Sequence, residues 1–349
     1  MTMLCGLDLH RGQITYDAFC EETGELWRGR IWSPDRARFR RWLQNEVAPR
    51  ADGASVAIAV EGCTGWRYVV EEIVAAGFEP HLSEPAETQA ARGRKKRAKT
   101  DRSDSALQRV LLASGELPES WIPPRDVLEW RERTRIYKTL VGDRRRWVQR
   151  IHAELFQHGV ALPEAAIRSD ETKKWLESDE VELSTAARER VGTCYKMIEA
   201  VEQEVAPLRL QFQRFAPRQP ACRALVETLF GVGPFTAVTC WVELGDCRRF
   251  SRSMRVVRHT GLDITVHASD LHRSGGYLSR EGPSTLRWAL FEAAKCAARP
   301  QAPDYAYYQA VKQRHDGKVA ALAVARKLAR RCYHILRAID PEEVYAMPG

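Results

Sequence analysis

The first 118 residues alternate between short apolar runs and amphipathic stretches, and this order limits the fold more than any other feature. Apolar or alternating runs predict strands over residues 3–8, 13–20, 26–32, 54–60 and 79–83. Helical spacing follows the third strand, with Ser33-Pro34 as the expected helix start, and again follows the fourth and fifth strands. Three strands followed by alternating helices and strands predict a mixed sheet with helices packed against it. We therefore expect an α/β domain over residues 1–118.

Four acids stand at positions where such a sheet would gather them. Asp8 and Glu61 each end a strand predicted to be buried, and sites in α/β sheets lie at such ends. Asp101 and Asp104 follow Thr100, a candidate N-cap, so a helix that starts here places both carboxylates on one face. Like charges on one face are mildly destabilising, whereas Mg2+ prefers carboxylate oxygens together with phosphates. The alternative is a solvated helix start whose acids complement the helix dipole.

Basic residues gather beside these acids and near the C-terminus, which indicates a polyanionic partner. The chain has a formal net charge of +8, and clustered cations favour nucleic acid over a merely soluble surface. Contacts with nucleic acid are expected from the run Arg94, Lys95, Lys96, Arg97, Lys99 and Arg102. A helix predicted over 318–339 carries a second basic face, which either meets phosphate or is solvated; its cations are Arg326, Lys327, Arg330, Arg331 and Arg337.

The middle of the chain reads as long helices without recognisable chemistry. Trp121-Ile-Pro-Pro124 breaks the pattern of the first domain. Residues 119–216 are expected to form a helical coiled-coil region, because apolar positions between 195 and 215 repeat close to a heptad. This region would carry an oligomer interface; the alternative is an intramolecular bundle packed against its own domain. Residues 217–340 predict a mostly α-helical C-terminal domain, and 341–349 a tail.

Two stretches of the C-terminal domain offer contacts or chemistry. Gly231 and Gly233 lie in a turn between two helical segments, which predicts a helix-hairpin-helix turn holding a phosphate through backbone N–H groups, or else a plain helical corner. A polar loop further on contains Ser269 and Ser274 beside histidines and Asp270. A serine needs activation to become a nucleophile, no Gly-x-Ser-x-Gly motif is present, and loops are rich in serine. The residues alone leave the role of these serines open.

Cysteine usage and hydropathy place the protein in a reducing compartment. The nine cysteines include no Cys-x-x-Cys pair, which predicts reduced thiols in a cytoplasm and no structural metal site. The N-terminus lacks a basic region followed by an apolar run, so no signal peptide is expected. Uncharged apolar stretches of about 18 residues are absent, so no membrane span is expected.

A set of short motifs stands in order along both ends of the chain. They are Gly6-Leu-Asp-Leu-His10, Val60-Glu-Gly-Cys-Thr-Gly65, Lys99-Thr-Asp-Arg-Ser-Asp104, Gly231-Val-Gly233, His259-Thr-Gly-Leu262, Ser269-Asp270, Ser279-Arg-Glu-Gly282 and Leu286-Arg-Trp-Ala289. As a set they resemble the DEDD transposases of bacterial insertion sequences, the IS110 family of bridge-RNA-guided serine recombinases.

The resemblance implies a site shared by two domains. The first domain would be RNase-H-like (RuvC-like), with Mg2+, or Mn2+ in its place, held by the four acids Asp8, Glu61, Asp101 and Asp104. The C-terminal transposase domain would supply a nucleophile at Ser269, which follows Gly261-Leu262 at the family's distance. Ser274 is the second candidate for that role. Arg273 and Arg280, in and beside the same loop, would contact nucleic acid.

The function implied is that of a DNA transposase that cuts and exchanges the strands of an insertion sequence through a phosphoserine–DNA intermediate. Its expected partners are double-stranded donor and target DNA, a noncoding bridge RNA, and further copies of the chain in a dimer or tetramer with shared active sites. It would act in the bacterial cytoplasm, at the nucleoid when bound to DNA. The alternatives are a site-specific invertase or Holliday-junction-type nuclease without guide RNA, and a non-catalytic nucleic-acid-binding protein.

Overall fold

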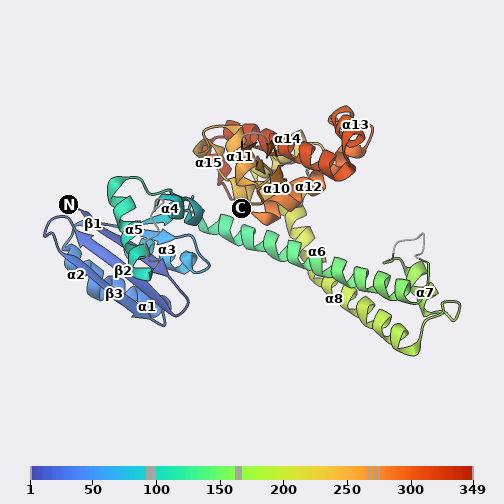
Figure 1. Cartoon of the computed structure of the whole chain (residues 1–349), viewed down its shortest axis with the longest axis horizontal. Helices are drawn as coiled ribbons and strands as arrows, with labels where there is room; N and C mark the ends of the chain where they lie inside the picture. The colour runs from blue at the N-terminus through green and yellow to red at the C-terminus, as the bar shows by residue number, and fades with distance from the viewer. Residues whose placement is uncertain are drawn as a thin grey trace. The chain divides into compact units, whose positions relative to one another are not determined.

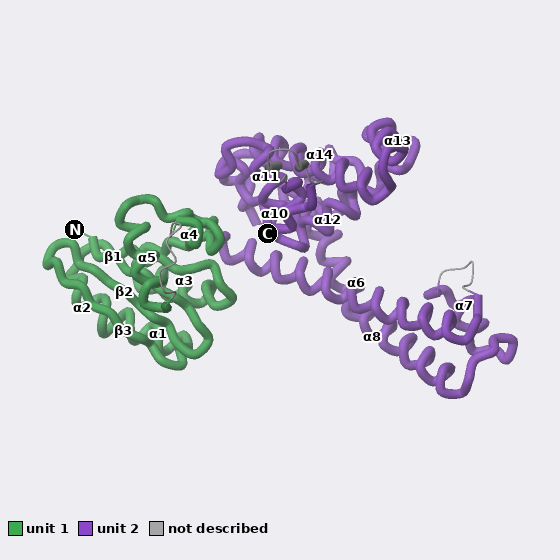
Figure 2. The backbone as a smooth tube through the Cα atoms, in the orientation of Figure 1, with its two compact units in different colours: residues 1–122 green, residues 123–349 purple. Residues whose placement is uncertain are grey.

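The chain forms two compact units, residues 1–122 and 123–349 (Figure 2). The computed structural model describes residues 2–91, 100–161, 167–265, 268–269, 272–273 and 276–347 (Figure 1). The first unit is the expected mixed α/β sheet domain, and the second is mostly helical. The second unit contains both the helical middle region and the C-terminal region. The sequence analysis had predicted these as two separate regions that meet at residue 216.

A five-stranded mixed sheet in the order β3-β2-β1-β4-β5 forms the frame of the first unit. β1 (Thr2–Leu9) pairs antiparallel with β2 (Gln13–Cys20), which pairs antiparallel with β3 (Leu26–Trp32). On its other side β1 pairs in parallel with β4 (Ser55–Glu61), and β4 with β5 (Glu79–Ser83). The five strands lie where their apolar or alternating runs predicted them. The arrangement is consistent with the RNase-H-like fold.

Helices cover both faces of this sheet. On one face Met3, Cys5 and Leu7 share a core with Phe39 and Ile73, which come from α1 (Arg36–Trp42) and α3 (Trp66–Ala75). The π-helical η1 (Leu43–Val47) and the short α2 (Ala48–Ala51) continue α1. The opposite face packs against α5 (Asp101–Ser114), and α4 (Pro85–Ala91) follows β5. Since side chains of a strand alternate between faces, the even-numbered residues of β1 point toward α5.

The first helix begins later than its sequence predicted. Ser33 has a φ of 45° and its amide donates a hydrogen bond to the carbonyl of Gly12 at 2.8 Å, so Ser33-Pro34 belong to the turn after β3. Asp35 is the N-cap, and its carboxylate accepts a hydrogen bond from the amide of Arg38 at 2.7 Å. The prediction that Ser33 starts this helix is therefore wrong, because the turn uses its backbone.

A long helical hairpin opens the second unit. α6 (Arg125–Gln157) and α8 (Thr185–Phe215) lie side by side (Figure 1), and α7 (Asp170–Glu177) stands between them in sequence. Most apolar positions of the predicted seam are buried: Tyr195, Ile198, Val205, Phe212 and Phe215. They pack on α6 of the same chain, at one end around Ile151 and at the other around Trp130. The seam is thus used within one chain, and an oligomer interface on this hairpin stays a prediction.

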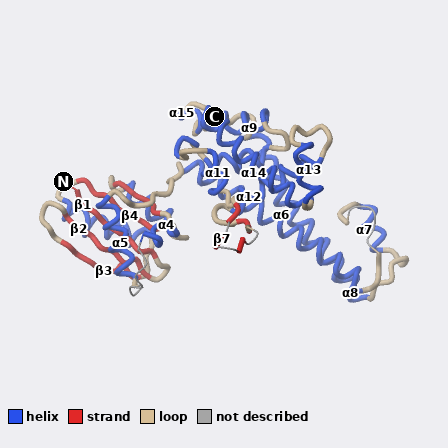
Figure 3. Tube along the Cα trace, turned by 45° about the horizontal axis from the view of Figure 1, so that its top comes forward, coloured by secondary structure: helices blue, strands red, loops and turns tan. Residues whose placement is uncertain are grey.

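The remainder of the second unit is a helical domain around α10 (Pro234–Leu244), whose residues 236–244 are all buried. α9 (Pro220–Thr228), α12 (Ser284–Ala294) and α14 (Gly317–Ala338) pack against it. Two short ribbons, β6 (Ile264–Thr265) with β9 (Tyr277–Leu278) and β7 (Ala268–Ser269) with β8 (His272–Arg273), stand between α11 and α12 in sequence (Figure 3). The other elements are η2 (Cys247–Arg249), α11 (Ser253–His259), η3 (Lys295–Ala298), α13 (Tyr305–Arg314) and α15 (Pro341–Val344).

The cations of the basic face predicted for α14 contact neighbouring segments of the same unit. Lys327 and Arg331 bind the buried carboxylate of Asp304, the former at 2.6 Å. The other cations donate to uncharged groups: Arg326 to the carbonyl of Leu262, Arg330 to the hydroxyl of Ser253, and Arg337 to the carbonyl of Phe250. These contacts hold α14 to neighbouring segments, while Arg330 and Arg337 are still exposed. Phosphate contact by this face stays a prediction.

The glycine-containing turn between α9 and α10 is packed against its own unit. Gly231 has a φ of 83°, and a Cβ added there would lie 2.6 Å from the carbonyl oxygen of Ala293. Glycine is therefore required at this corner by both conformation and space. Gly233 caps α10, and an added Cβ would meet no atom within 4 Å there. The turn between two helices lies where the sequence predicted it. Phosphate binding by its backbone N–H groups stays a prediction.

All nine cysteines are free, as the sequence predicted. Among the described residues, the helices lack the combined length and hydropathy needed to span a bilayer.

Candidate metal centre

Asp8 and Glu61 lie side by side at the carboxyl ends of two parallel strands. In the register of β1 and β4, Gly6 is opposite Ala59 and Leu7 is opposite Val60. The next residue on each strand is the acid, so the two carboxylates extend from neighbouring strands on one face of the sheet. Asp8 is 4% exposed. An acid this deeply buried needs a compensating partner.

Gly6 allows α5 to approach this face closely. A Cβ added at Gly6 would lie 2.1 Å from the carbonyl oxygen of Ser105 and 2.5 Å from the amide nitrogen of Arg109. Any other residue would therefore force α5 outward. Ala59, opposite Gly6, packs with Leu111 of α5. Gly6 and Ala59, each two residues before an acid, thus allow α5 to pack closely against the sheet.

The start of α5 is fixed by a reciprocal cap. The hydroxyl of Thr100 accepts a hydrogen bond from the amide of Ser103 at 3.2 Å, and the hydroxyl of Ser103 accepts one from the amide of Thr100 at 3.1 Å. Asp101 and Asp104 therefore fall in the first turn, where the helix dipole favours carboxylates. The helix begins at the residue that the sequence predicted.

Further along the helix, Arg109 ties α5 to β2. Its guanidinium binds the carboxylate of Asp17, which is fully buried and also binds Arg28. Arg109 also lies over the ring of Phe19, 5.6 Å from its centre. This cation at the end of the basic run 92–109 is thus a structural residue of the first unit.

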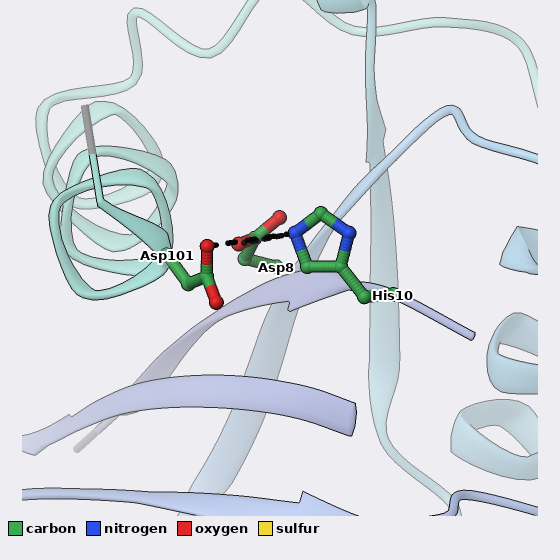
Figure 4. A group of neighbouring side chains, drawn as sticks. All are labelled: Asp8, His10 and Asp101. Carbon is green, nitrogen blue, oxygen red and sulfur yellow. Dashed lines mark ion pairs between the residues drawn. The ribbon is translucent and has the colours of Figure 1, made fainter. Parts of the chain in front are cut away.

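Three of the side chains come within ligand distance of one another (Figure 4). His10 Nε2 lies 3.2 Å from Asp8 Oδ2 and 3.6 Å from Asp101 Oδ1. One ligand atom from each of the three residues lies within 4.8 Å of the other two. Gln13 donates from Nε2 to Asp101 Oδ2 at 2.6 Å and thereby fixes that carboxylate.

All four predicted acids line one cavity of about 440 Å³. His10, Cys63, Thr88, Gln89 and Gln108 are among its other lining residues. The pKa of Asp8 is raised to about 6, chiefly because burial disfavours the charged carboxylate; His10 opposes the rise, and Asp101, Asp104 and Glu61 add to it. Carboxylates that repel one another around a cavity fit a hard divalent cation, which would offset their repulsion.

His10 and Gln13 are residues that sequence reasoning missed. His10 closes the Gly6-Leu-Asp-Leu-His10 motif and has the same strand parity as Asp8, a signal that could have found it. Gln13 begins β2 and reaches Asp101 only because of the hairpin and the position of α5. No pattern in the sequence carries that information.

Several predicted site residues have no described side chain. Arg94, Lys95, Lys96, Arg97 and Lys99 lie outside the described residues, as does Ser274. For Ser269 and Arg273 the backbone alone is described, in the paired strands β7 and β8. Arg102 and Arg280 are both exposed, and Arg280 has a φ of 56°. The roles of all these residues remain predictions.

Comparisons with known proteins agree at both ends of the chain. A family model for a DEDD transposase of the IS110 type, described as "Transposase", matches residues 5–159, and one described as "Transposase IS116/IS110/IS902 family" matches residues 223–309. The first match spans the four acids, and the second spans the polar loop.

Individual relatives are also named as transposases. The chain is 29% identical to a protein named as a transposase, y4rJ of Sinorhizobium fredii, over 76% of this chain and 72% of the relative. It is 25% identical to the transposase for insertion sequence element IS1328 of Yersinia enterocolitica, over 78% and 81%. The transposase for element IS1111A of Coxiella burnetii is 23% identical over 69% and 66%. A DEDD domain implies use of a divalent metal ion, in agreement with the acidic cavity. Together these findings show that the chain is similar to DEDD transposases of the IS110 family, and they support a DNA transposase activity.

Proposed function

We propose that this transposase exchanges DNA strands with Mg2+ held by Asp8, Glu61, Asp101 and Asp104 and with Ser269 as nucleophile. The observation that supports the metal part is the convergence of the four acids on one cavity. When bound there, the ion would polarise a phosphate and stabilise charge on the departing oxygen. Mn2+ offers the same oxygen preference and would replace it.

The proposed covalent step conserves the phosphodiester. The Ser269 hydroxyl oxygen forms a bond to phosphorus, the bond between phosphorus and the 3′-oxygen breaks, and the hydroxyl proton ends on that oxygen. A free 3′-hydroxyl on another strand then reverses the step, releases the serine and joins the new strand. Because one ester replaces another, no external energy source is needed. Ser274 is the alternative nucleophile.

The acidic centre arranges its own residues for this chemistry. Asp101 is oriented by Gln13, and Asp8 is flanked by His10, so each of these two carboxylates has a polar neighbour. The raised pKa of Asp8 means that cation binding would release a proton when the pH is below about 6.

Sequence selection would come from a bridge RNA that pairs with donor and target DNA. The protein would then hold backbones and leave base reading to pairing. The basic run over residues 92–102 supports this division, because clustered cations bind phosphates irrespective of sequence. Gly231, Gly233, Arg273 and Arg280 would add contacts from the second unit. We further propose a dimer or tetramer with active sites shared between subunits, acting in the bacterial cytoplasm.

The test is a denaturation-resistant protein–DNA adduct. The protein, expressed with its native flanking DNA so that bound RNA is recovered, is incubated with labelled donor and target DNA and Mg2+. We expect an adduct with wild type and Ser274→Ala, and its loss in Ser269→Ala and Asp101→Ala. Loss in Ser274→Ala alone would move the nucleophile to that residue.

A second candidate function is a metal-dependent invertase or junction nuclease without guide RNA, favoured by the fact that four acids alone can carry metal-dependent phosphodiester cleavage. Cleavage without adduct in every sample would replace the serine mechanism by this one. Full activity after RNase treatment would remove the guide RNA from the proposal.

A further inference from the structure

A second polar cavity, of about 520 Å³, lies within the second unit. α6 supplies one wall with Arg135, Lys138, Thr139, Gly142 and Arg146, whose spacing of three, one, three and four residues places them on one helix face. The opposite wall is the start of α12 with Pro283, Ser284 and Thr285, and Glu243 of α10 completes the lining. Nothing in the metal chemistry of the first unit uses this cavity.

Cations dominate the walls of this cavity. Lys138 donates to the hydroxyl of Ser284 at 2.8 Å. Partial burial lowers the pKa of Lys138, and the nearby charge of Arg287 lowers it further. Arg135 is 58% exposed and pairs with Glu243, and Arg146 is 62% exposed and pairs with Asp143, so three lining cations face two carboxylates. A concentration of positive charge beside a cavity fits an anionic ligand.

The start of α12 reinforces the preference for an anion. Pro283 is its N-cap residue, and no side chain caps this end through a hydrogen bond. First-turn N–H groups without a side-chain cap, together with the helix dipole, bind phosphate. Ser284 and Thr285 add hydroxyl groups that donate to phosphate oxygens.

Glu243 adds a buried carboxylate to a cavity that is otherwise lined by cations and hydroxyl groups. This side chain is 3% exposed, and its Oε1 atom accepts no hydrogen bond from any described residue. Arg135 Nη2 is 3.7 Å from that oxygen, and Arg131 Nε is 3.3 Å from the other carboxylate oxygen. A buried acceptor left without a hydrogen bond costs free energy that a ligand's N–H group would recover.

Gly142 keeps the cavity open. Glycine in the interior of a helix destabilises it by about 1 kcal/mol relative to alanine, yet Gly142 stands in the middle of the 33-residue α6. A Cβ there would meet only Arg146 Nη1, at 3.8 Å. Packing therefore does not require glycine, and the absence of a side chain leaves space within the cavity.

We infer that this cavity holds one unpaired nucleotide, with its phosphate at the start of α12 among Lys138 and Arg146 and its base at Glu243. A carboxylate accepts from an exocyclic amino group, as on cytosine, adenine or guanine. In thymine and uracil the carbonyl oxygens flank the single N–H and repel a carboxylate. The volume is in the range of small-ligand pockets, roughly 300 to 1,000 Å³. This inference rests on the proposed function only in taking nucleic acid as the substrate.

The test measures equilibrium binding of labelled duplexes to the full-length protein by fluorescence anisotropy, in EDTA so that the metal centre is silent. The probes are a DNA duplex with one unpaired cytidine, the same duplex with an abasic or thymidine residue at that position, and the fully paired duplex. Parallel RNA probes tell which nucleic acid supplies the nucleotide. We expect the unpaired cytidine to bind about tenfold more tightly than the other three.

Four variants locate that preference. Arg146→Ala should weaken binding of the unpaired cytidine about tenfold, whereas Arg145→Ala, which removes the same charge from the adjacent exposed position, should not. Gly142→Leu should fill the cavity and abolish the preference. Glu243→Leu, which removes the acceptor, should remove the difference between cytidine and abasic probes while phosphate binding persists. Melting temperatures of each variant verify folding.

Two outcomes would overturn the inference: equal affinity of wild type for all probes of both nucleic acids, or an undiminished preference for unpaired cytidine in folded Gly142→Leu. The adduct assay is separate. A protein that forms adducts but shows no preference disproves the nucleotide cavity alone, whereas a preference without adducts or cleavage disproves the proposed function alone.

Discussion

Gly6 is the residue on which the geometry of the metal centre most directly depends. Replacement by alanine would place a methyl group 2.1 Å from the Ser105 carbonyl oxygen, so α5 must move away from the sheet. We expect Gly6→Ala to lower the free energy of unfolding by about 1 to 3 kcal/mol. Affinity for Mn2+ should fall roughly tenfold or more, because Asp101 and Asp104 move with the helix.

Urea denaturation and calorimetric titration with Mn2+ measure both effects. Gly12→Ala is the matched control, since a Cβ there would meet nothing within 4 Å. If Gly6→Ala bound Mn2+ as tightly as Gly12→Ala, the placement of the acids would not depend on this close approach.

Asp8 gives the metal-free protein a distinctive pH dependence. Its pKa rises from 3.8 to about 6 on folding, so the folded state carries no penalty below about pH 4 and the full penalty above about pH 6. The group therefore makes the metal-free protein less stable as the pH rises through this window, by about 3 kcal/mol at most. Affinity for a divalent cation should change in the opposite sense and weaken below about pH 6, because the cation must displace the proton.

Urea denaturation in EDTA and Mn2+ titration at a series of pH values reveal the two trends. Asp8→Asn should remove this contribution to the stability slope. An unchanged slope in that variant would assign the titration to another group.

The sequence predicted which acids line the cavity better than it predicted the residues that contact those acids. Asp8, Glu61, Asp101 and Asp104 could be placed on one cavity from strand ends and helix spacing, because local patterns determine both. The contact between Gln13 and Asp101 depends on where α5 lies relative to the β1–β2 hairpin. That position is set by packing at Gly6 and by Arg109, which no local pattern states.

At the scale of elements, Arg109 and Asp17 act as the attachment of α5 to the sheet. Asp17 is fully buried, and removal of one partner from a buried ion pair costs about 3 kcal/mol. We expect Arg109→Ala to lower the stability of the first unit by about that amount or less, because Arg28 still binds Asp17. Hydrogen exchange in β2 and α5 under mild urea measures it.

Arg102→Ala is the comparison, since it removes an exposed cation from the same helix. Equal exchange in Arg102→Ala and Arg109→Ala would show that the buried pair does not attach the helix.

The bounds of helices and strands were predictable where caps and apolar patterns agree. The contacts of charged residues on a helix face were less predictable. The five strands and the start of α5 lie within a residue or two of their patterns. For the cations of α14 the sequence left phosphate contact and solvation open. Only the structure shows that Asp304, from a distant segment, is buried against Lys327 and Arg331.

At the scale of the whole molecule, the acids that would bind a divalent cation all belong to residues 1–122. Addition of Mn2+ should therefore slow hydrogen exchange in β1, β4 and α5 and leave α9–α15 unchanged. Mass spectrometry of peptides from both units provides the measurement, and Asp101→Ala should abolish the effect. Equal protection of both units would indicate a second cation site.

The division into units also shows what a single sequence lacks. Residues 119–216 have a helical repeat that reads as a separate coiled coil, yet α6 and α8 pack against α10 of the C-terminal region within one unit. Phe212, a position of this repeat, contacts the rings of Tyr137 in α6 and Phe235 in α10. The spacing of apolar residues along one helix does not tell which other helix packs against them.

The reciprocal cap of Thr100 and Ser103 suggests where a reporter group can be inserted next to the metal centre. Both hydrogen bonds of this cap join residues 100 and 103, so the first turn of α5, which carries Asp101 and Asp104, closes upon itself. A short tag or a cysteine for fluorophore attachment inserted within residues 92–99 is therefore expected to leave Mn2+ affinity intact. Such a reporter, a few residues from the acids, would turn strand exchange into an optical signal.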